Sequence, residues 1–337
     1  MSRFSISYQP FDGDADSWNS LTIDAEDASF LQTWEFGEAK SKTSLWRVER
    51  GVLVERGSLI GTVQSMIRKP FFSKSGLVWI NRGPVGVKGN YGEALHALTR
   101  QFCNERQMYL RVAPSRLAGE LSFLECKASG LSKTNMLGWA SSVVDLTKDR
   151  KHLRQNLNGK WRNALTRAER AEIEISISAD SSSFRRFLRG HAHHLQKFGP
   201  KGGLEIEFLL SLQNILPIHR RFMCVAAHKD GDYLGGALIV KHGKLAEYLA
   251  GHNLVKGRSI NAGQLILWKA MMHLKETGAK KFDLGGMDEN LSPPGIFRFK
   301  KRIGGIPYRL AHEMEGPAHG IVSKIIRWRV NVLRSRG

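Results

Sequence analysis

The chain has 337 residues, of which 42% are hydrophobic, so it can fold as one large or two ordinary globular domains and should not be disordered. Lysine and arginine outnumber aspartate and glutamate by 51 to 31, a formal net charge of +20 that favours polyanionic partners such as nucleic acid, anionic lipid headgroups or phosphorylated substrates. Three widely spaced cysteines argue against a disulfide framework or a metal site, and the N-terminal segment lacks the apolar core of a signal peptide, so we expect a cytoplasmic protein.

The first half of the chain predicts three strands, a helix and a fourth strand. Apolar runs bounded by glycine turns within Leu45–Gly57, Ser58–Lys69 and Gly76–Val85 indicate the strands. The helix is predicted from Asn90, which can cap its N-terminus with Glu93 three residues further on. A short apolar strand follows at residues 108–114.

The second half repeats this order. Residues 221–253 contain three apolar runs separated by glycine turns, and a helix is predicted from Asn261, the expected N-cap, to Gly278, which suits a left-handed C-terminal position. A strand follows at residues 280–286. Strand, strand, strand, helix, strand therefore occurs twice, and this order resembles the core of the GNAT acyltransferase fold. We expect an α/β (α+β) protein with two tandem GNAT-like domains, each a mixed sheet flanked by helices.

The segment between the two halves is predicted to be helical. Leu153, Leu157, Trp161 and Leu165 recur every four residues and share one face, while Gly159 predicts a break into two helices. We therefore expect an N-terminal domain at residues 1–150, a C-terminal domain with the linking helices at 151–316, and a separate C-terminal helix at 317–337.

Common catalytic motifs are missing from the sequence. It has neither a G-x-x-x-x-G-K-[ST] phosphate loop nor a G-x-S-x-G nucleophile elbow. His191 and His194 would share a helical face, but one pair lacks the further ligands of a metal site, so we expect no metal. Direct attack of a bound amine on an activated ester requires no covalent nucleophile.

Four segments, in order, resemble the FemABX family of peptidyltransferases, which are twin-GNAT proteins. They are QTWEFGEAK (32–40), INRGPV (80–85), KWRNALTRA (160–168), and a long segment from Glu247 to Gly305 that ends in GIFRFKKRIGG. The resemblance implies transfer of an amino acid from aminoacyl-tRNA, as co-substrate and without a cofactor, to an amine of a peptidoglycan precursor or similar phosphorylated acceptor. The basic charge suits both tRNA and a phosphorylated or lipid-linked cell-wall precursor.

The same resemblance points to one lysine near the end of the long segment, and the lysine next to it is a second candidate. Lys300 matches a family lysine, and an ammonium there could stabilise the oxyanion of a tetrahedral intermediate. Lys301 could bind phosphate. We expect this stretch to return along an edge of the second domain with Lys300 directed to a cleft. On a strand, the alternative is that Phe297 and Phe299 point inward and Lys300 points to water.

Four further residues are candidates for binding the acceptor. Lys40 and Arg162 match positions that contact acceptor phosphates in relatives, although both could simply lie on solvated helix faces. Arg82 could turn toward a cleft or end a strand. Tyr248 could line the acceptor pocket or pack in the core. Relatives often carry an acidic residue shortly after the R-G-P-V segment, where this chain has Lys88.

Two other functions remain open at this stage. The segment Arg258–Gly263 resembles a degraded GNAT pyrophosphate loop, which predicts a coenzyme A thioester as donor and an acyl-CoA-dependent N-acyltransferase of cell-envelope or polysaccharide biosynthesis. Asn261 replaces the first glycine of that loop and would hinder close backbone approach. The third alternative is a non-catalytic RNA-binding protein at a membrane surface.

The C-terminal segment predicts a basic amphipathic helix. Ile321, Ile325, Trp328 and Val332 share one face, and no acid follows Gly320. The basic residues on the other faces are Lys324, Arg327, Arg329, Arg334 and Arg336. Such a helix suits an anionic membrane at the inner face of the cell membrane, but it could also pack on its own domain or bind tRNA.

Overall fold

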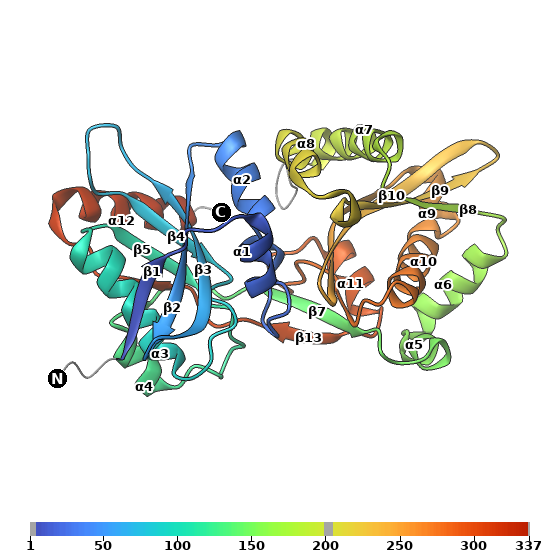
Figure 1. Ribbon diagram of the computed structural model, residues 1–337. Coiled ribbons are helices and arrows are strands. Elements are labelled where there is room, and N and C mark those ends of the chain that lie inside the picture. The colour runs from blue at the N-terminus through green and yellow to red at the C-terminus, as the bar shows by residue number, and fades with distance from the viewer. Residues whose placement is uncertain (1–4, 199–204, 336–337) are drawn as a thin grey trace. The chain divides into compact units, whose positions relative to one another are not determined.

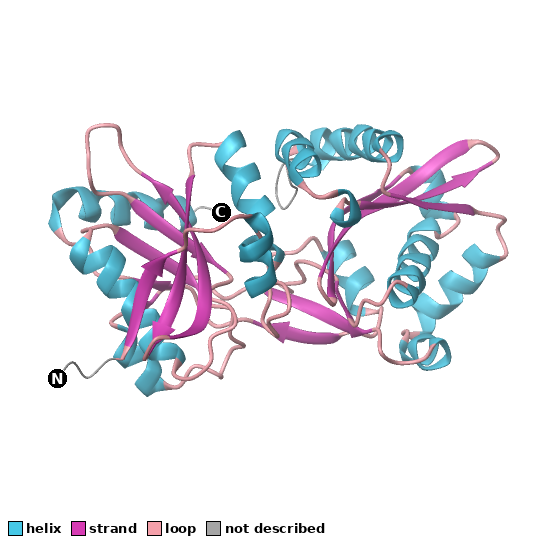
Figure 2. Cartoon of the chain, viewed as in Figure 1, coloured by secondary structure: helices cyan, strands magenta, loops and turns pink. Residues whose placement is uncertain are grey.

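The computed structural model describes residues 5–198 and 205–335, and the chain divides into two compact units. Unit 1 comprises Met1–Trp139 and Arg309–Gly337, and unit 2 comprises Ala140–Tyr308. Each unit contains a seven-stranded mixed sheet flanked by helices (Figures 1 and 2). The predicted architecture of two similar α/β domains is confirmed.

The sheet of unit 1 has the strand order β1-β2-β3-β4-β5-β14-β6. All neighbouring strands are antiparallel except β4 and β5, which are parallel. Its strands are β1 (Ile6–Pro10), β2 (Arg47–Glu55), β3 (Ser58–Arg68), β4 (Leu77–Asn81), β5 (Tyr109–Ala113), β6 (Ser132–Lys133) and β14 (Met314–Glu315). Its α-helices are α1 (Ala15–Thr22), α2 (Trp34–Thr43), α3 (Tyr91–Thr99), α4 (Phe123–Ser129) and α12 (Gly320–Ser335).

The sheet of unit 2 has the order β13-β7-β12-β11-β10-β9-β8. Here β11 and β12 are the parallel pair, and β8, β9, β10 and β11 pair in antiparallel fashion. Its strands are β7 (Ala140–Asp145), β8 (Glu174–Ser178), β9 (Met223–Lys229), β10 (Asp232–His242), β11 (Leu245–Asn253), β12 (Lys281–Asp283) and β13 (Ile306–Arg309). Its α-helices are α5 (Arg150–Asn156), α6 (Gly159–Glu169), α7 (Ser181–Phe198), α8 (Ile206–Ile215), α9 (Val255–Ser259), α10 (Ala262–Glu276) and α11 (Pro294–Lys301).

The repeated order of elements is present in both sheets. In unit 1, β2, β3 and β4 are followed by α3 and then by β5, which pairs parallel to β4. In unit 2, β9, β10 and β11 are followed by α10 and then by β12, which pairs parallel to β11. A helix between two neighbouring parallel strands is the crossover that parallel pairing requires.

The two crossover helices begin differently. The Asn90 side chain accepts a hydrogen bond from the backbone N–H of Glu93 and caps α3 as predicted. The predicted side-chain cap of α10 is wrong. Asn261 instead adopts a left-handed conformation with φ of 63° and makes no side-chain cap bond. Asparagine tolerates this conformation, which carries the chain from α9 into α10.

The linking segment forms two helices, as its glycine predicts. Helix α5 ends at Asn156 and α6 begins at Gly159. The four apolar residues of its repeat, from Leu153 to Leu165, are buried in the core of unit 2 together with Trp268 of α10.

The boundaries of the two units differ from the predicted boundaries at residues 150 and 316. Strand β7 pairs with β12, so the chain enters unit 2 at Ala140. Strand β14 pairs with both β5 and β6, so the chain returns to unit 1 at Arg309. The C-terminal helix, α12, is therefore part of unit 1 rather than a separate segment. Strand pairing between residues far apart in sequence decides these boundaries.

Across the described residues, no helix has both the length and the apolar composition needed to cross a lipid bilayer.

Candidate active site

Lys300 lies on helix α11 of unit 2, so the alternative in which Phe297 and Phe299 point inward from a strand is wrong. Pro294 at the first turn suits a helix start because its fixed φ matches the helix and its missing N–H is not needed there. Phe299 packs against Trp161 of α6, with ring centroids 6.0 Å apart. This contact holds α11 on the core, and Lys300, the next residue, is only 8% exposed.

The Lys300 ammonium lies among backbone and aromatic groups. Its Nζ donates a hydrogen bond of 3.0 Å to the carbonyl oxygen of Gly286 and lies 5.2 Å from the ring centroid of Tyr248. Burial lowers the pKa of Lys300 to about 8, against the opposing effect of the Asp283 charge. Lys300 is thus still mainly protonated near neutral pH. An ammonium has three N–H donors, so two remain for a bound substrate.

Asp283, at the end of β12, supplies the carboxylate that acts on Lys300. It is 4% exposed. One carboxylate oxygen accepts hydrogen bonds from the backbone N–H of Gly285 at 2.7 Å and from the Ser141 hydroxyl, while the other accepts from the Tyr308 hydroxyl. Three elements, β7, β12 and β13, therefore hold a buried negative charge beside the ammonium.

This carboxylate and its partners are not among the site residues predicted from the sequence. Asp283 directly precedes Leu284-Gly285-Gly286, and an acid at a strand end before two glycines could have been a signal. The sequence gives no indication that Ser141 and Tyr308 belong to the site, because each lies far from Asp283 in sequence and approaches it only through strand pairing.

Gly285 is required by the backbone of the site. Its φ is +71°, and a Cβ at this position would lie 2.6 Å from the carbonyl oxygen of Tyr248 and 3.5 Å from Nζ of Lys300. Any larger residue would be strained and would collide with the Tyr248 backbone. The Gly285–Gly286 segment thus brings a bare backbone up to Lys300.

Tyr248, on β11, is half-buried and forms one wall of the ammonium site. Burial raises the pKa of its hydroxyl, so the phenol stays neutral. A Cβ at residue 251 would collide with this hydroxyl, so Gly251 allows the ring to lie in this position. A role for Tyr248 in binding the acceptor stays a prediction.

Lys301, unlike Lys300, lines a basic depression of about 570 Å³ on unit 2. Its Nζ lies 5.3 Å from the Phe297 ring centroid. The residues that line the depression are Asn158, Glu289, Pro294, Phe297, Arg298, Lys301 and Arg302. Arg162 is not among them; it lies one turn beyond the α6 N-cap, Asn158, and donates to the carbonyl oxygen of Gln155 at 3.2 Å.

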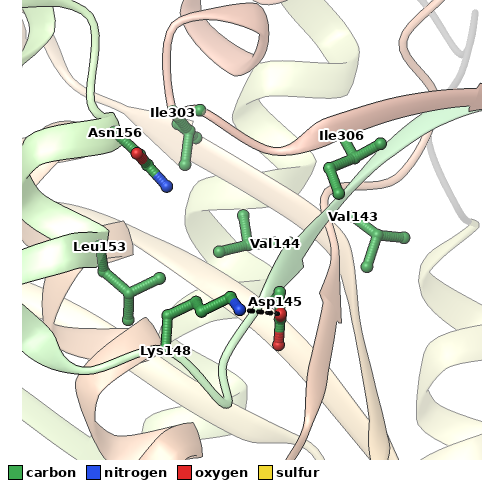
Figure 3. A pocket seen from close by; sticks show the side chains of 9 residues that line it. Val143, Val144, Asp145, Lys148, Leu153, Asn156, Ile303 and Ile306 are labelled. Carbon is green, nitrogen blue, oxygen red and sulfur yellow. Dashed lines mark ion pairs between the residues drawn. The ribbon is translucent and has the colours of Figure 1, made fainter.

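A second cavity, of about 100 Å³, lies between β7, α5 and the turn after α11 (Figure 3). Lys148 and Asp145 form an ion pair of 3.8 Å at its edge, and its other walls are mostly apolar. None of the predicted site residues lines it. Its volume is below the roughly 300 Å³ at which small-molecule pockets begin, so we assign it no role in the site.

Lys40 and Arg82 belong to unit 1, whereas the other four predicted residues belong to unit 2. Lys40 is half-buried on α2. The Gln32 side chain binds the backbone of Gln64 and Asn81, and a Cβ at Gly37 would collide with the Gln64 side chain. The QTWEFGEAK segment thus packs α2 closely on the sheet and sets the position of Lys40.

Arg82 follows the end of β4. It adopts a left-handed φ of 50°, and its guanidinium lies 4.5 Å from the ring centroid of Trp139. The chain also has an acid near this turn, although not in the following sequence: Asp27 accepts hydrogen bonds of 2.8 Å from the Gly86 N–H and from the Ser115 hydroxyl. Lys88, the residue noted in the sequence, is exposed.

Of the two histidines singled out on α7, the structure describes the surroundings of one. His191 is buried and stacks on Phe187, with ring centroids 5.7 Å apart, and the His194 side chain lies outside the described residues. In the part of the chain that the structure describes, no group of three or more His, Cys, Asp or Glu side chains is arranged to hold a metal ion.

Comparison with known proteins supports the GNAT assignment. A family model described as an acetyltransferase (GNAT) domain matches residues 151–301. The Lipid II:glycine glycyltransferase of Staphylococcus saprophyticus is 32% identical over 80 residues, which are 23% of this chain and only 19% of that relative's length.

Solved structures match far more of the chain. FemX aligns with a TM-score of 0.78 at 16% identity, covering 91% of this chain and 96% of FemX. A tandem GNAT protein from the clavulanic acid biosynthesis pathway aligns with a TM-score of 0.52 at 10% identity, over 94% of this chain and 99% of that one. L-PGS from Bacillus licheniformis aligns with a TM-score of 0.50 at 12% identity, over 82% and 86%. The chain therefore contains a GNAT domain and has the FemX-like twin-GNAT fold that its repeated elements predict.

Proposed function

We propose that this protein transfers an amino acid from aminoacyl-tRNA to an amine of a peptidoglycan precursor or a similar phosphorylated acceptor. The observation that carries the proposal is the buried Lys300 ammonium, held by the Gly286 carbonyl beside Tyr248 in the GNAT domain of unit 2. The FemX-like fold and the short similarity to a Lipid II:glycine glycyltransferase support this choice of donor and acceptor.

The reaction needs no covalent enzyme intermediate. The neutral acceptor amine attacks the ester carbonyl carbon of aminoacyl-tRNA, and negative charge develops on the carbonyl oxygen. Lys300 donates an N–H to this oxyanion in a site where burial strengthens the interaction. The intermediate then collapses: the amide bond is formed, the ester C–O bond breaks, and the proton lost by the amine ends on the ribose oxygen of the tRNA.

Basic residues outside this centre suit the phosphates of the two substrates. Arg298, Lys301 and Arg302 line one depression of unit 2, and we assign phosphate binding to it. Lys40, Arg82 and Arg162 remain proposed contacts to the acceptor. Each cation that replaces counterions around a phosphate should add a salt-sensitive contribution to the binding free energy.

A transfer assay with purified full-length protein tests the proposal. Bulk tRNA charged with radiolabelled amino acids is incubated with nucleotide-linked and lipid-linked cell-wall precursors, and label in the precursor is measured after the tRNA ester is hydrolysed. Acetyl-CoA replaces aminoacyl-tRNA in a parallel arm. We expect label from tRNA only. Transfer from acetyl-CoA, with none from aminoacyl-tRNA, would contradict the proposal.

The acetyl-CoA arm addresses the second candidate, which the GNAT family match favours. At the start of α10, however, the backbone N–H groups of Asn261 and Gln264 donate to the carbonyl oxygens of Arg258 and Asn261. Two amides that a pyrophosphate would need are thus already bonded within the turn, so we rank the coenzyme A donor second.

The alkaline limb of the pH profile should depend on Asp283. Lys300 acts as the ammonium, so activity falls as pH rises through its pKa of about 8. Asp283 opposes the lowering of that pKa. Asp283→Asn should therefore lower the pKa further and move the fall in kcat to more acidic pH.

The matched control is Ser141→Ala, which removes one hydrogen bond to Asp283 but keeps its charge. Profiles of kcat are measured from about pH 6 to pH 10, with background ester hydrolysis subtracted. An alkaline limb that stays in place in Asp283→Asn, or that moves equally in Ser141→Ala, would show that the Asp283 charge does not act on the reacting group.

A further inference from the structure

Helix α12 turns its apolar face to solvent. Ile321, Ile325 and Trp328 are 78%, 56% and 68% exposed. On the opposite side of the helix, Ser323 is fully buried, and Asn331 accepts a hydrogen bond of 2.7 Å from Arg111. The half-buried apolar residues of the helix include Ile326 and Val330, which share the side of Ser323. Three of the four residues of the apolar face predicted from the sequence are therefore exposed, and the fourth, Val332, is half-buried.

The β3–β4 loop exposes a second apolar group next to this helix. Phe71 and Phe72 are almost wholly exposed. The Ser75 and Ser323 hydroxyls lie 2.9 Å apart, and both donate to the carbonyl oxygen of Gln107. The base of the loop is thus bonded to the first turns of α12, and Figure 1 shows loop and helix on the same side of unit 1.

Basic side chains surround these apolar residues. Lys69 and Lys74 of the loop and Lys324 and Arg329 of the helix are exposed. Neither residues 69–76 nor α12 contains an aspartate or glutamate. We call this region, formed by Phe71, Phe72, Ile321, Ile325 and Trp328 with their four cations, the apolar-basic surface.

We propose that the apolar-basic surface docks unit 1 onto an anionic lipid bilayer. Exposed aromatic and aliphatic side chains gain free energy on entering the interfacial region of a bilayer, and the surrounding cations are attracted to anionic headgroups. Two separate segments contribute, which matters because one short amphipathic helix binds only modestly by itself. A nucleic-acid surface would match the cations but would leave Ile321 and Ile325 without an apolar environment.

This docking goes beyond the transfer reaction and does not depend on it, since none of the residues of the surface belongs to the proposed site. It would bring the protein to the surface where a lipid-linked acceptor resides. A negative result in the transfer assay would not contradict the docking proposal, and absence of vesicle binding would not contradict the proposed transfer reaction.

Co-sedimentation of the full-length protein with vesicles tests the proposal. Vesicles of phosphatidylglycerol and phosphatidylcholine are compared with vesicles of phosphatidylcholine alone. We expect binding to the anionic vesicles, reduced about tenfold or more in Phe71→Ser/Phe72→Ser and in Ile325→Ser/Trp328→Ser. Because these side chains are exposed, the variants should keep the wild-type Tm.

The matched control is Phe123→Ser/Leu124→Ser on α4. These two residues are 80% and 74% exposed but lie beside Glu120 and Glu125, so binding should be unchanged. Absence of wild-type binding to anionic vesicles, or an equal loss in the control, would overturn the proposal. So would surface variants that keep vesicle binding but lose affinity for tRNA, or that only convert a dimer to a monomer on a sizing column.

Discussion

Replacing Lys300 with alanine should lower kcat by about a hundredfold or more, the loss typical of removing one oxyanion donor. The ammonium is buried, and its position is set by Gly286 and Tyr248, so water cannot easily replace it when charge develops on the substrate oxygen. Stability should change little. Loss of the hydrogen bond to Gly286 is offset by removal of a charge that burial disfavours, as the lowered pKa of Lys300 shows.

The control for Lys300→Ala is Lys301→Ala, which removes an identical side chain from the adjacent position. Lys301 is exposed and faces the basic depression, so this variant should raise KM with little change in kcat. Both parameters are measured by steady-state transfer with unfolding monitored in parallel. An unchanged kcat in Lys300→Ala would remove Lys300 from the mechanism, and a rise in KM alone would make it a binding residue.

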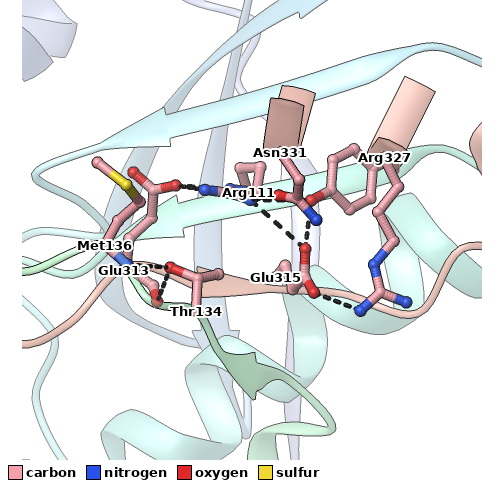
Figure 4. Close-up of polar contacts among 8 residues, drawn as sticks. Arg111, Thr134, Met136, Glu313, Glu315, Arg327 and Asn331 are labelled. Carbon is pink, nitrogen blue, oxygen red and sulfur yellow. Dashed lines mark hydrogen bonds and ion pairs between the residues drawn. The ribbon is translucent and has the colours of Figure 1, made fainter. Parts of the chain in front are cut away.

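Replacing Arg111 with methionine should lower the free energy of unfolding of unit 1 by about 3–5 kcal/mol. Arg111 on β5 is 1% exposed. Its guanidinium binds Glu313 through Nε at 2.6 Å and approaches Glu315 at 3.4 Å (Figure 4). Methionine would fill the space but leave both buried carboxylates without this cation, and an uncompensated buried charge is strongly destabilising.

The large loss of stability should be specific to Arg111, which is the buried cation next to these carboxylates. Arg327 also pairs with Glu315, but its side chain is 45% exposed, so Arg327→Met should cost no more than about 1 kcal/mol. Adding Glu313→Gln to Arg111→Met should recover part of the loss, because it removes one stranded charge. Urea unfolding with hydrogen exchange of β5 and β14 reports on unit 1 separately. Equal destabilisation by the two arginine variants would contradict this account of the network.

Local sequence patterns were sufficient to predict most of the helices and strands. The two strands between Arg47 and Arg68 are apolar-rich runs separated by a glycine turn, and the helix cap at Asn90 acts within three residues of itself. Gly159 correctly predicted two linking helices. The internal repeat was visible because each copy encodes the same order of strands and helix, and that order with a parallel last pair implies a crossover.

The local sequence pattern did not predict helix α11. Phe297 and Phe299 alternate as they would on a strand, and a segment of eight residues is too short for periodicity to separate the two structures. The contact of Phe299 with Trp161, far away in sequence, holds the helix instead. The same contact decides that Lys300 faces Gly286 and that Lys301 faces the basic depression.

The sequence by itself determined that the chain has two similar α/β domains and a large excess of basic residues. It also identified Lys300 and Lys301 as candidate site residues. These conclusions were possible because apolar strand runs, helix period and charge are local properties. Only the tertiary structure decided what surrounds them. Asp283 meets Ser141 and Tyr308 through pairing of β7, β12 and β13. The C-terminal segment returns to unit 1 because β14 pairs with β5, and α12 exposes its apolar face because Ser323 and Asn331 bind polar groups of unit 1. Tyr308 lies 25 positions from Asp283, and the other pairings join residues more than a hundred positions apart. No local pattern encodes either kind of pairing.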